Sequence, residues 1–267
     1  MKYKILCSDL DGTLLSSKSD VSKFAIEQIS KIKNHTRIIL VSARMPSGMR
    51  YIQESIGISN QPIICYNGAL VLSGQQELTS VVIPVNLLKE IYSLCTNLEV
   101  DLGLYYANEW YVPLTSIRVE KEIKYTKSTP TFQSTLITLS NWEQRKIGAH
   151  KIMLMCTKES ADTLMPLLKE KFINQLNLYR SNDTLIEIAP KSVSKLSAIK
   201  LLMNSNDSLE DIIAFGDNYN DVEMLENVGC GVAVANAREE VKAISNHVTL
   251  KNTEDGVAHF IKEHLVI

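Results

Sequence analysis

The 267-residue sequence predicts an α/β fold, with a doubly wound parallel sheet of the Rossmann type as its core and an α+β domain inserted into that core. Two observations lead to this prediction. Short apolar runs alternate with amphipathic stretches towards both ends of the chain, as in a sheet that helices cover on both faces. The middle of the chain departs from this alternation, which indicates a second structural unit.

The apolar runs have the length of strands, and each ends at a polar residue or a glycine. They are continuously apolar instead of alternating with polar residues, which is typical of parallel strands buried on both faces. We expect these strands to span residues 5–7, 37–41, 62–66 and 212–215. Residues 21–32 and 194–203 carry apolar side chains at the spacing of helices that pack on a sheet.

Residues 84–190 have a different order of elements, with antiparallel character. We expect helices at 85–95, near Arg118 and at 158–172, and strands at 102–106, 110–112, 149–156, 176–179 and 184–188. This arrangement is typical of an α+β domain. We therefore expect residues 1–83 and 191–267 to form one core domain and residues 84–190 to form the inserted domain.

Charge and composition exclude several classes of protein. With 28 basic and 30 acidic residues and a net charge of −2, the chain lacks the positive field that non-specific nucleic-acid binding needs. No uncharged stretch approaches the ~18–20 residues that cross a bilayer. The five cysteines form no C-x-x-C pair and lie mostly among apolar residues, as in a reducing compartment. We expect a cytoplasmic monomer or weak homo-oligomer that binds a small molecule, and neither nucleic acid nor a membrane.

Polar side chains follow the predicted strands at the edge where ligands bind in an open parallel sheet, beyond the carboxyl ends of the strands. One of them stands instead at the start of a predicted helix that precedes the last strand. We expect these side chains to converge: Asp9, Asp11, Ser42, Lys195, Asp217, Asn220 and Asp221.

Carboxylates gathered at one place need a cation or a proton, because two of them ~4 Å apart repel by roughly 4 kcal/mol at an effective dielectric constant near 20. Mg²⁺ takes one or two carboxylates together with water and phosphate oxygens. A lysine, a serine hydroxyl and backbone N–H groups suit a phosphoryl dianion. One carboxylate can attack phosphorus while a neighbour acts as general acid and base. The set therefore indicates phosphoryl transfer.

Each acidic segment also has a simpler interpretation when taken alone. Residues 9–12 and 216–218 are each compatible with a turn that an Asx hydrogen bond stabilises. A calcium loop is excluded, because it needs Gly at its sixth position and Glu at its twelfth. Counted from Asp9 and from Asp217, these positions hold Leu14 and Asp20, and Val222 and Val228.

Several segments together resemble a known family. Asp9-Leu10-Asp11-Gly12-Thr13-Leu14 resembles the first motif of the haloacid dehalogenase (HAD) superfamily of phosphohydrolases, and residues 216–221 resemble its fourth motif. Ser42 and Lys195 match the second and third motifs. Further stretches resemble the Cof-type branch, which carries a large C2-type α/β cap between the second and third motifs: residues 67–69, 185–188, 193–195, 234–237 and 254–257.

The resemblance implies a HAD-like core, a cap that selects the substrate, and a Mg²⁺-dependent phosphatase that forms an aspartyl phosphate. It implies that Asp9 is the nucleophile and a Mg²⁺ ligand, and that Asp217 is a further ligand. It also implies that Asp11 is the general acid and base and binds the metal through its backbone carbonyl. The implied phosphate-binding residues are Ser42, Lys195 and Asn220, with the backbone amides of Leu10 and Ala43, while Asp221 orients Lys195 or a metal-bound water.

Ala43 departs from the family pattern, which usually has glycine at this position, and a positive φ there would be strained. The expected substrate is a small phosphorylated metabolite, in the first place a sugar phosphate. Two alternatives stay open: a sugar phosphomutase of the same superfamily, and a non-catalytic sensor of a phosphorylated ligand. The pair Asp9 and Asp11 argues against the sensor, because binding needs neither a nucleophile nor an acid.

Overall fold

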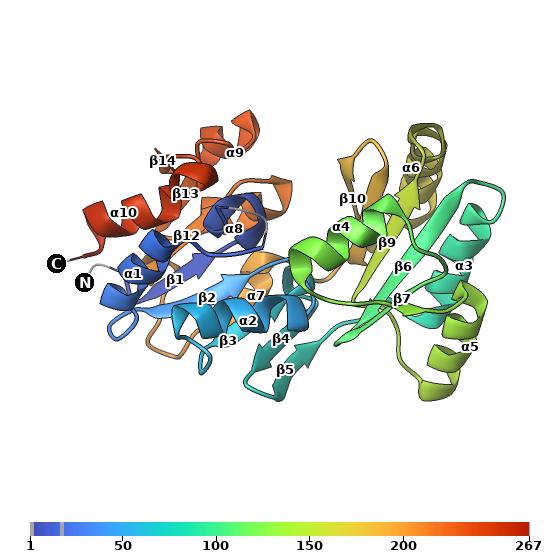
Figure 1. The fold of residues 1–267 in the computed structure, drawn as a ribbon, viewed down its shortest axis with the longest axis horizontal. Helices are drawn as coiled ribbons and strands as arrows, with labels where there is room; N and C mark the ends of the chain where they lie inside the picture. Colours follow the sequence, from blue (N-terminus) through green and yellow to red (C-terminus); the bar gives the residue numbers. More distant parts are fainter. Residues whose placement is uncertain (1–2, 17–18, 267) are drawn as a thin grey trace. The chain divides into compact units, whose positions relative to one another are not determined.

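The computed structural model describes residues 3–16 and 19–266 and divides the chain into two compact units. The first unit is built from both ends of the chain, up to Leu78 and from Ser194 onward, and the second is Thr79–Val193. In Figure 1 the first unit is blue and orange to red, and the second is mainly green to yellow. The sequence predicts the boundaries at 83/84 and 190/191, a few residues from those in the structure.

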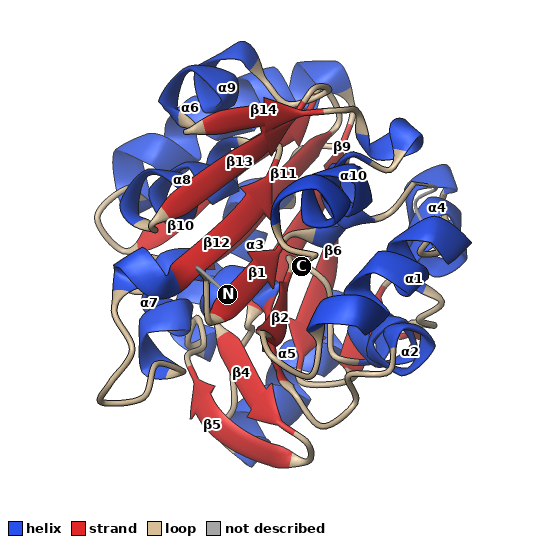
Figure 2. Ribbon diagram, turned by 90° about the vertical axis from the view of Figure 1, so that its left-hand side faces the viewer, coloured by secondary structure: helices blue, strands red, loops and turns tan. Residues whose placement is uncertain are grey.

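The first unit is a sheet with helices on both faces (Figure 2). Its strands lie in the order β14-β13-β12-β1-β2-β3-β4-β5, and the pairings from β14 to β3 are parallel. The strands are β1 (Ile5–Ser8), β2 (Arg37–Val41), β3 (Pro62–Cys65), β4 (Leu70–Ser73), β5 (Gln76–Ser80), β12 (Ile212–Gly216), β13 (Cys230–Val234) and β14 (His247–Thr249).

The helices of this unit form two groups, one on each face of the sheet (Figure 2). The first group consists of α1 (Lys23–Ile32), α2 (Ser47–Ile56) and α10 (Gly256–His264). The second group consists of α7 (Lys195–Leu201), α8 (Val222–Asn227) and α9 (Glu239–Ile244). Helices on both faces explain why the strands between them are continuously apolar, as the sequence predicts.

Strands β1 and β12 lie next to each other in the middle of the sheet, and every side chain of both is buried. Burying one large aliphatic side chain of this kind contributes about 1.5–3 kcal/mol, which favours the most apolar strands at the centre. The two strands pair in parallel, with Ser8 opposite Phe215. This register brings the residues that follow the two strands to the same edge of the sheet.

The sheet is parallel from β14 to β3 and becomes antiparallel beyond β3. β4 pairs antiparallel with β3, and β5 extends the sheet beyond β4. The chain reverses at Tyr66 and Asn67, whose φ angles are 52° and 56°. A tight turn of this kind joins antiparallel neighbours, whereas a parallel connection needs a crossover of a dozen or more residues.

The second unit has a six-stranded sheet in the order β10-β11-β9-β6-β7-β8. Its described pairings are antiparallel except for β7 with β8. The strands are β6 (Val100–Tyr106), β7 (Glu109–Val112), β8 (Thr131–Phe132), β9 (Lys151–Cys156), β10 (Leu176–Asn182) and β11 (Leu185–Pro190), and the helices are α3 (Val85–Cys95), α4 (Ile117–Thr126), α5 (Thr135–Arg145) and α6 (Lys158–Phe172). Apolar side chains of α3, α5 and α6 pack with one face of this sheet to form the core of the unit.

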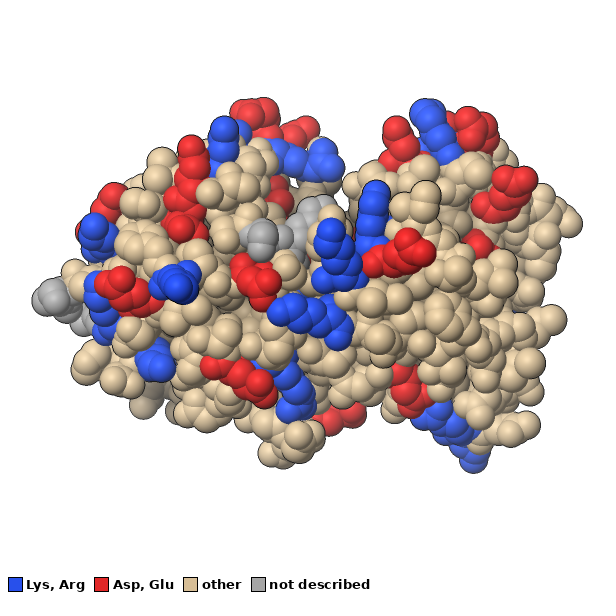
Figure 3. Space-filling view, viewed as in Figure 1, with Lys and Arg blue, Asp and Glu red and all other residues tan. Residues whose placement is uncertain are grey.

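The charges on the surface have no single sign on the face that Figure 3 shows, where acidic and basic side chains are interspersed on both units. All five cysteines are free thiols, and four of them are buried. Among the described residues, no helix combines the length and the apolar character that crossing a membrane requires.

Candidate active site

Three acidic side chains meet at the carboxyl edge of the first unit's sheet. Asp9 follows β1, and Asp217 follows the neighbouring strand β12. Asp221 lies one turn further along the chain from Asp217. Carboxylate oxygens of these three residues lie within 4.8 Å of one another. We call these three residues the acidic cluster.

The turn after β1 fits closely against Asp217. Gly12 has a φ of +88°, which glycine adopts without strain, and a Cβ at this position would lie 2.6 Å from Oδ2 of Asp217. Thr13 donates a hydrogen bond from Oγ1 to Oδ1 of Asp217 over 3.1 Å. The turn can therefore fix the Asp217 carboxylate only because residue 12 has no side chain.

Lys195 is a buried cation between two members of the acidic cluster. Its Nζ lies 2.6 Å from Oδ1 of Asp9 and 2.6 Å from Oδ1 of Asp221, and its side chain is fully buried. Lys195 is the first residue of α7, whose N-terminus is capped by the side chain of Ser194. The cap fixes the start of the helix and therefore the point from which the lysine reaches the carboxylates.

Asp221 connects Lys195 to the loop that follows β12. Its Oδ2 accepts hydrogen bonds from the backbone N–H groups of Asp217 and Asn218, each over 3.0 Å, while Oδ1 accepts from Lys195. A Cβ on Gly216 would lie 2.5 Å from the Asp221 Cβ, so glycine is needed for this close approach. Because both carboxylate oxygens have partners, Asp221 is better suited to orient Lys195 than to bind a metal.

The acidic cluster holds more negative charge than Lys195 can balance. Burial raises the pKa of Asp217 to about 7, and the neighbouring Asp221 charge adds to the effect. Burial also raises the pKa of Asp9 well above its ordinary value, although Lys195 opposes the shift. Burial disfavours the charged form of Lys195, but its two carboxylate partners outweigh burial and raise its pKa. When all three carboxylates are ionised, the single ammonium group leaves two negative charges without a partner.

The segment after β2 lies against the turn that follows β3. Ser42 is buried, and its carbonyl oxygen accepts a hydrogen bond from the backbone N–H of Asn67 over 2.9 Å. The side chain of Asn67 in turn accepts a hydrogen bond from Nδ2 of Asn220 over 3.0 Å. Ala43 is not among the described residues with a positive φ, so alanine in place of the family's glycine is not strained here.

The Asp11 carboxylate is turned towards Arg44 and is not part of the acidic cluster. Arg44 donates hydrogen bonds from Nε and Nη2 to the two Asp11 oxygens, each over 2.7 Å. The structure therefore brings Lys195 to the acidic cluster at this edge of the sheet, while the Asp11 carboxylate is held separately. Leu10, between the two aspartates, is buried.

Comparisons with known proteins identify the family. Residues 6–261 match the model of the haloacid dehalogenase-like hydrolases. The chain is 34% identical to a Haemophilus influenzae protein over 98% of each chain, and 27% identical to the pyridoxal phosphate phosphatase YbhA of Escherichia coli over the full length of both. A crystal structure of a haloacid dehalogenase-like hydrolase from Bacteroides thetaiotaomicron superimposes with a TM-score of 0.87 at 26% identity, covering 98% of this chain and 99% of that one.

The chain belongs to the haloacid dehalogenase-like hydrolase family. The resemblance seen in the sequence and the α/β fold class are both confirmed. Because it belongs to this family and its relatives are named as phosphatases, this HAD-family protein is an enzyme that hydrolyses phosphoric monoesters.

The residues of the HAD-family site fit a divalent cation. The acidic cluster offers oxygen ligands only, which is the donor set of a hard ion. Its two unbalanced negative charges match the charge of such an ion, and Gly12 leaves the Asp217 carboxylate open where a side chain would fill the space. Asp9 and Asp217 would hold the cation, because the oxygens of Asp221 are already occupied.

Sequence reasoning missed two contacts of this HAD-family site. Arg44 and Asn67 were not assigned roles, although Arg44 follows Ser42 and Ala43 directly and Asn67 lies in a segment that matches the Cof-type branch. Their partners, Asp11 and Asn220, are distant in sequence. A motif shows which residues are present, but not which side chains pair across the sheet edge.

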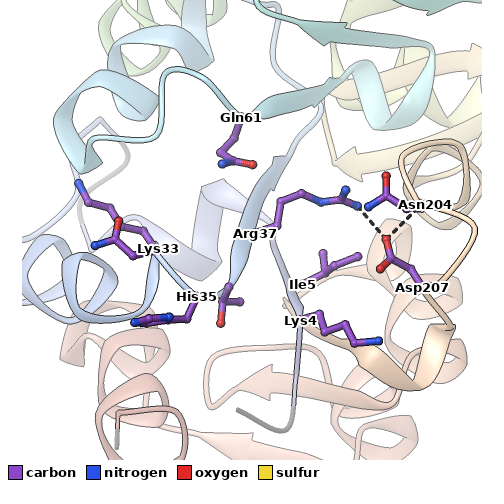
Figure 4. Close-up of a pocket in the computed structure, with 10 residues that line it drawn as sticks. Lys4, Ile5, Lys33, His35, Arg37, Gln61, Asn204 and Asp207 are labelled. Atoms are coloured by element: carbon purple, nitrogen blue, oxygen red, sulfur yellow. Dashed lines mark hydrogen bonds and ion pairs between the residues drawn. The ribbon is translucent and has the colours of Figure 1, made fainter.

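The opposite, amino-terminal edge of the sheet has a pocket of about 360 Å³ at the start of β1 and β2 (Figure 4). Two of its basic side chains, those of Lys4 and Arg37, pair with acidic partners in the same unit. Arg37 lies 3.6 Å from Asp207, and Lys4 lies 3.1 Å from Asp211. These pairs make the pocket a less suitable place for a phosphorylated substrate than the carboxyl edge.

Proposed function

We propose that this phosphatase depends on Mg²⁺ and hydrolyses a small phosphorylated metabolite, in the first place a sugar phosphate, through an aspartyl phosphate on Asp9. The observation that supports the proposal most is the uncompensated charge of the acidic cluster beside Lys195. A divalent cation balances the two negative charges that Lys195 leaves, and Mg²⁺ bound by carboxylates keeps other coordination positions for water and phosphate oxygens.

The chemistry that we propose runs in two steps. In the first, an Oδ atom of Asp9 attacks phosphorus, the bond from phosphorus to the leaving oxygen breaks, and Asp11 gives its proton to that oxygen. In the second, Asp11 takes a proton from water as the water oxygen attacks phosphorus and the bond from Asp9 to phosphorus breaks. Inorganic phosphate leaves, and both aspartates return to their starting state.

Other residues of the site would hold the phosphoryl oxygens during both steps. The proposed donors are the ammonium group of Lys195, the hydroxyl of Ser42, the amide of Asn220 and the backbone N–H groups of Leu10 and Ala43. Bound Mg²⁺, held by Asp9, Asp217 and the backbone carbonyl of Asp11, would neutralise charge on these oxygens. Asp221 would keep Lys195 in position, in accord with the 2.6 Å contact between them.

We assign catalysis to the first unit and selection of the substrate to the second. Every residue of the proposed chemistry belongs to the first unit. The second unit, Thr79–Val193, would correspond to the cap that the Cof-type resemblance implies. A relative named for pyridoxal phosphate supports a small phosphorylated substrate, and free cysteines fit the cytoplasmic location that we propose.

A screen of phosphorylated metabolites for phosphate release tests the proposal. We expect release with Mg²⁺ and none after chelation with EDTA. Asp9→Asn should lower the rate by at least about 10³-fold, because it removes the nucleophile and keeps the shape. Asp20→Asn, a change at an exposed position of the same unit, is the matched control.

The same screen separates the alternatives. A phosphomutase would convert a sugar phosphate to an isomer without releasing phosphate. A sensor would bind a phosphorylated ligand without changing it. Retention of labelled phosphate on the wild type after acid quenching, and its absence in Asp9→Asn, would support the aspartyl phosphate. Full activity of purified Asp9→Asn would end the proposal.

A further inference from the structure

Arg44 binds the carboxylate of Asp11 through two parallel hydrogen bonds. Nε donates to Oδ2 and Nη2 donates to Oδ1, each over 2.7 Å. Bidentate pairs of this kind fix the direction of a carboxylate as well as its position. Among residues 3–16 and 19–266, Arg44 is the residue that hydrogen-bonds this carboxylate. The Asp11 side chain is 44% exposed.

The guanidinium group is itself fixed from the other side. Its Nη1 donates to the carbonyl oxygen of Gly48 over 3.1 Å and to Oη of Tyr51 over 3.0 Å. Both partners belong to α2, and the Tyr51 hydroxyl donates onward to the carbonyl oxygen of Ser19 over 2.7 Å. The Arg44 side chain is only 3% exposed. A buried, fully anchored cation therefore holds a carboxylate that is partly open to solvent.

The turn that carries Asp11 does not fix its side chain by other means. Asp11 has φ −78° and ψ 109°, outside the helical region, and Gly12, which follows it, is also outside that region. Its charged neighbours in the acidic cluster would repel it, because they have the same sign. The only attraction from a described cation that acts at hydrogen-bonding distance comes from Arg44.

We propose that Arg44 is a positioning residue for the proton transfers of Asp11. This inference rests on the proposed function, in which Asp11 protonates the leaving oxygen and later takes a proton from water. Each carboxylate oxygen has two lone-pair sites, so a bidentate arginine leaves one on each oxygen for substrate or water. Arg44 sets where that free site points. It takes no part in the attack of Asp9 on phosphorus.

The proposal predicts an effect that depends on the leaving group. p-Nitrophenyl phosphate releases an anion that needs little protonation, whereas phenyl phosphate releases a more basic one. In Arg44→Met, kcat/KM for phenyl phosphate should fall on the order of 10²-fold, the cost of a misplaced proton donor. For p-nitrophenyl phosphate, kcat/KM should fall less than tenfold, because attack by Asp9 is unaffected.

The second step gives an independent signature. It needs Asp11 as a base whatever the substrate, so phosphoenzyme should accumulate in Arg44→Met. We expect a burst of p-nitrophenolate followed by a slow steady state, which the wild type lacks. Arg44→Lys keeps the charge but offers only one well-directed hydrogen bond. Its accumulation of phosphoenzyme should lie between that of the wild type and that of Arg44→Met. Arg50→Met, from the same helix as Tyr51, is the matched control and should behave as the wild type.

Equal losses for the two substrates, without a burst, would assign Arg44 a structural or phosphate-binding role and overturn the proposal. If Arg44→Met does not fold, as judged by its thermal unfolding, Arg44→Lys decides in the same way. Failure of the proposed function looks different, because the wild type would then hydrolyse neither ester with Mg²⁺. If the wild type is active and Asp11→Asn discriminates between the esters but the Arg44 variants do not, only this inference fails.

Discussion

Replacing Lys195 with methionine should destabilise the first unit by about 4 kcal/mol at pH 7 and by about 2 kcal/mol at pH 5.5. Methionine keeps most of the volume and removes the charge. Each 2.6 Å contact of Nζ with a carboxylate of Asp9 or Asp221 represents about 6 kcal/mol of attraction at an effective dielectric constant of 20. Without the ammonium group, the acidic cluster would hold three carboxylates and no cation to balance them.

Proton binding limits the loss of stability in Lys195→Met. The folded variant can take up a proton in place of the ammonium group, and protonating a carboxyl of ordinary pKa near 3.9 costs about 4 kcal/mol at pH 7. This cost falls by about 1.4 kcal/mol for each pH unit, to about 2 kcal/mol at pH 5.5. The variant should therefore recover stability, relative to the wild type, as the pH is lowered.

Urea unfolding without Mg²⁺, followed by far-UV circular dichroism, measures the effect. Tryptophan fluorescence does not, because both tryptophans, Trp110 and Trp142, lie in the second unit. Lys200→Met is the control, since Lys200 lies on the same helix and is exposed. A loss below 1 kcal/mol at pH 7, or an equal loss at both pH values, would refute the reasoning that Lys195 balances buried carboxylates.

Three further predictions concern other features. Gly12→Ala would place a Cβ 2.6 Å from Oδ2 of Asp217, at a φ of +88°. Mg²⁺ binding, measured by calorimetry, should weaken about tenfold or more, and an unchanged affinity would argue against Asp217 as a ligand. Because Asp217 has a raised pKa of about 7 and must lose its proton to bind metal, Mg²⁺ should bind about tenfold more tightly at pH 8 than at pH 6. Burial lowers the pKa of His150 to about 4, so only the unfolded state binds its proton between pH 6.5 and 4. The free energy of unfolding of the second unit, followed by tryptophan fluorescence, should therefore fall by about 3 kcal/mol from pH 6.5 to pH 4. In His150→Gln it should fall correspondingly less, and equal decreases in the two proteins would contradict the prediction.

Much of the fold could be predicted because the apolar pattern alone determines it. The helices at Val85–Cys95 and Lys158–Phe172 begin and end where the sequence predicts, the first directly after Pro84 and the second after Thr157, whose side chain caps it. The strand pair β4 and β5 was not predicted. β5 is largely exposed and lies at the edge of the sheet, so it has no buried apolar run to mark it.

The site could be predicted as far as strand ends determine it. Asp9 and Asp217 meet because two buried parallel strands pair in register. The orientation of Asp11 could not be predicted, because it depends on Arg44, 33 residues away, and on how α2 fixes the guanidinium group. Spacing along the chain predicts which residues reach an edge, but not which partner each side chain selects there.

The order of the strands has a consequence for a chain that emerges residue by residue from the ribosome. β1 lies between β2 and β12, so one of its edges has no neighbour until residues 212–216 have been made. The second unit is continuous, and its strands are synthesised in one stretch before that point. Because domains generally fold as units during synthesis, it can close first. Asp9 is therefore joined by its counter-ion Lys195 only after the whole second unit has been synthesised.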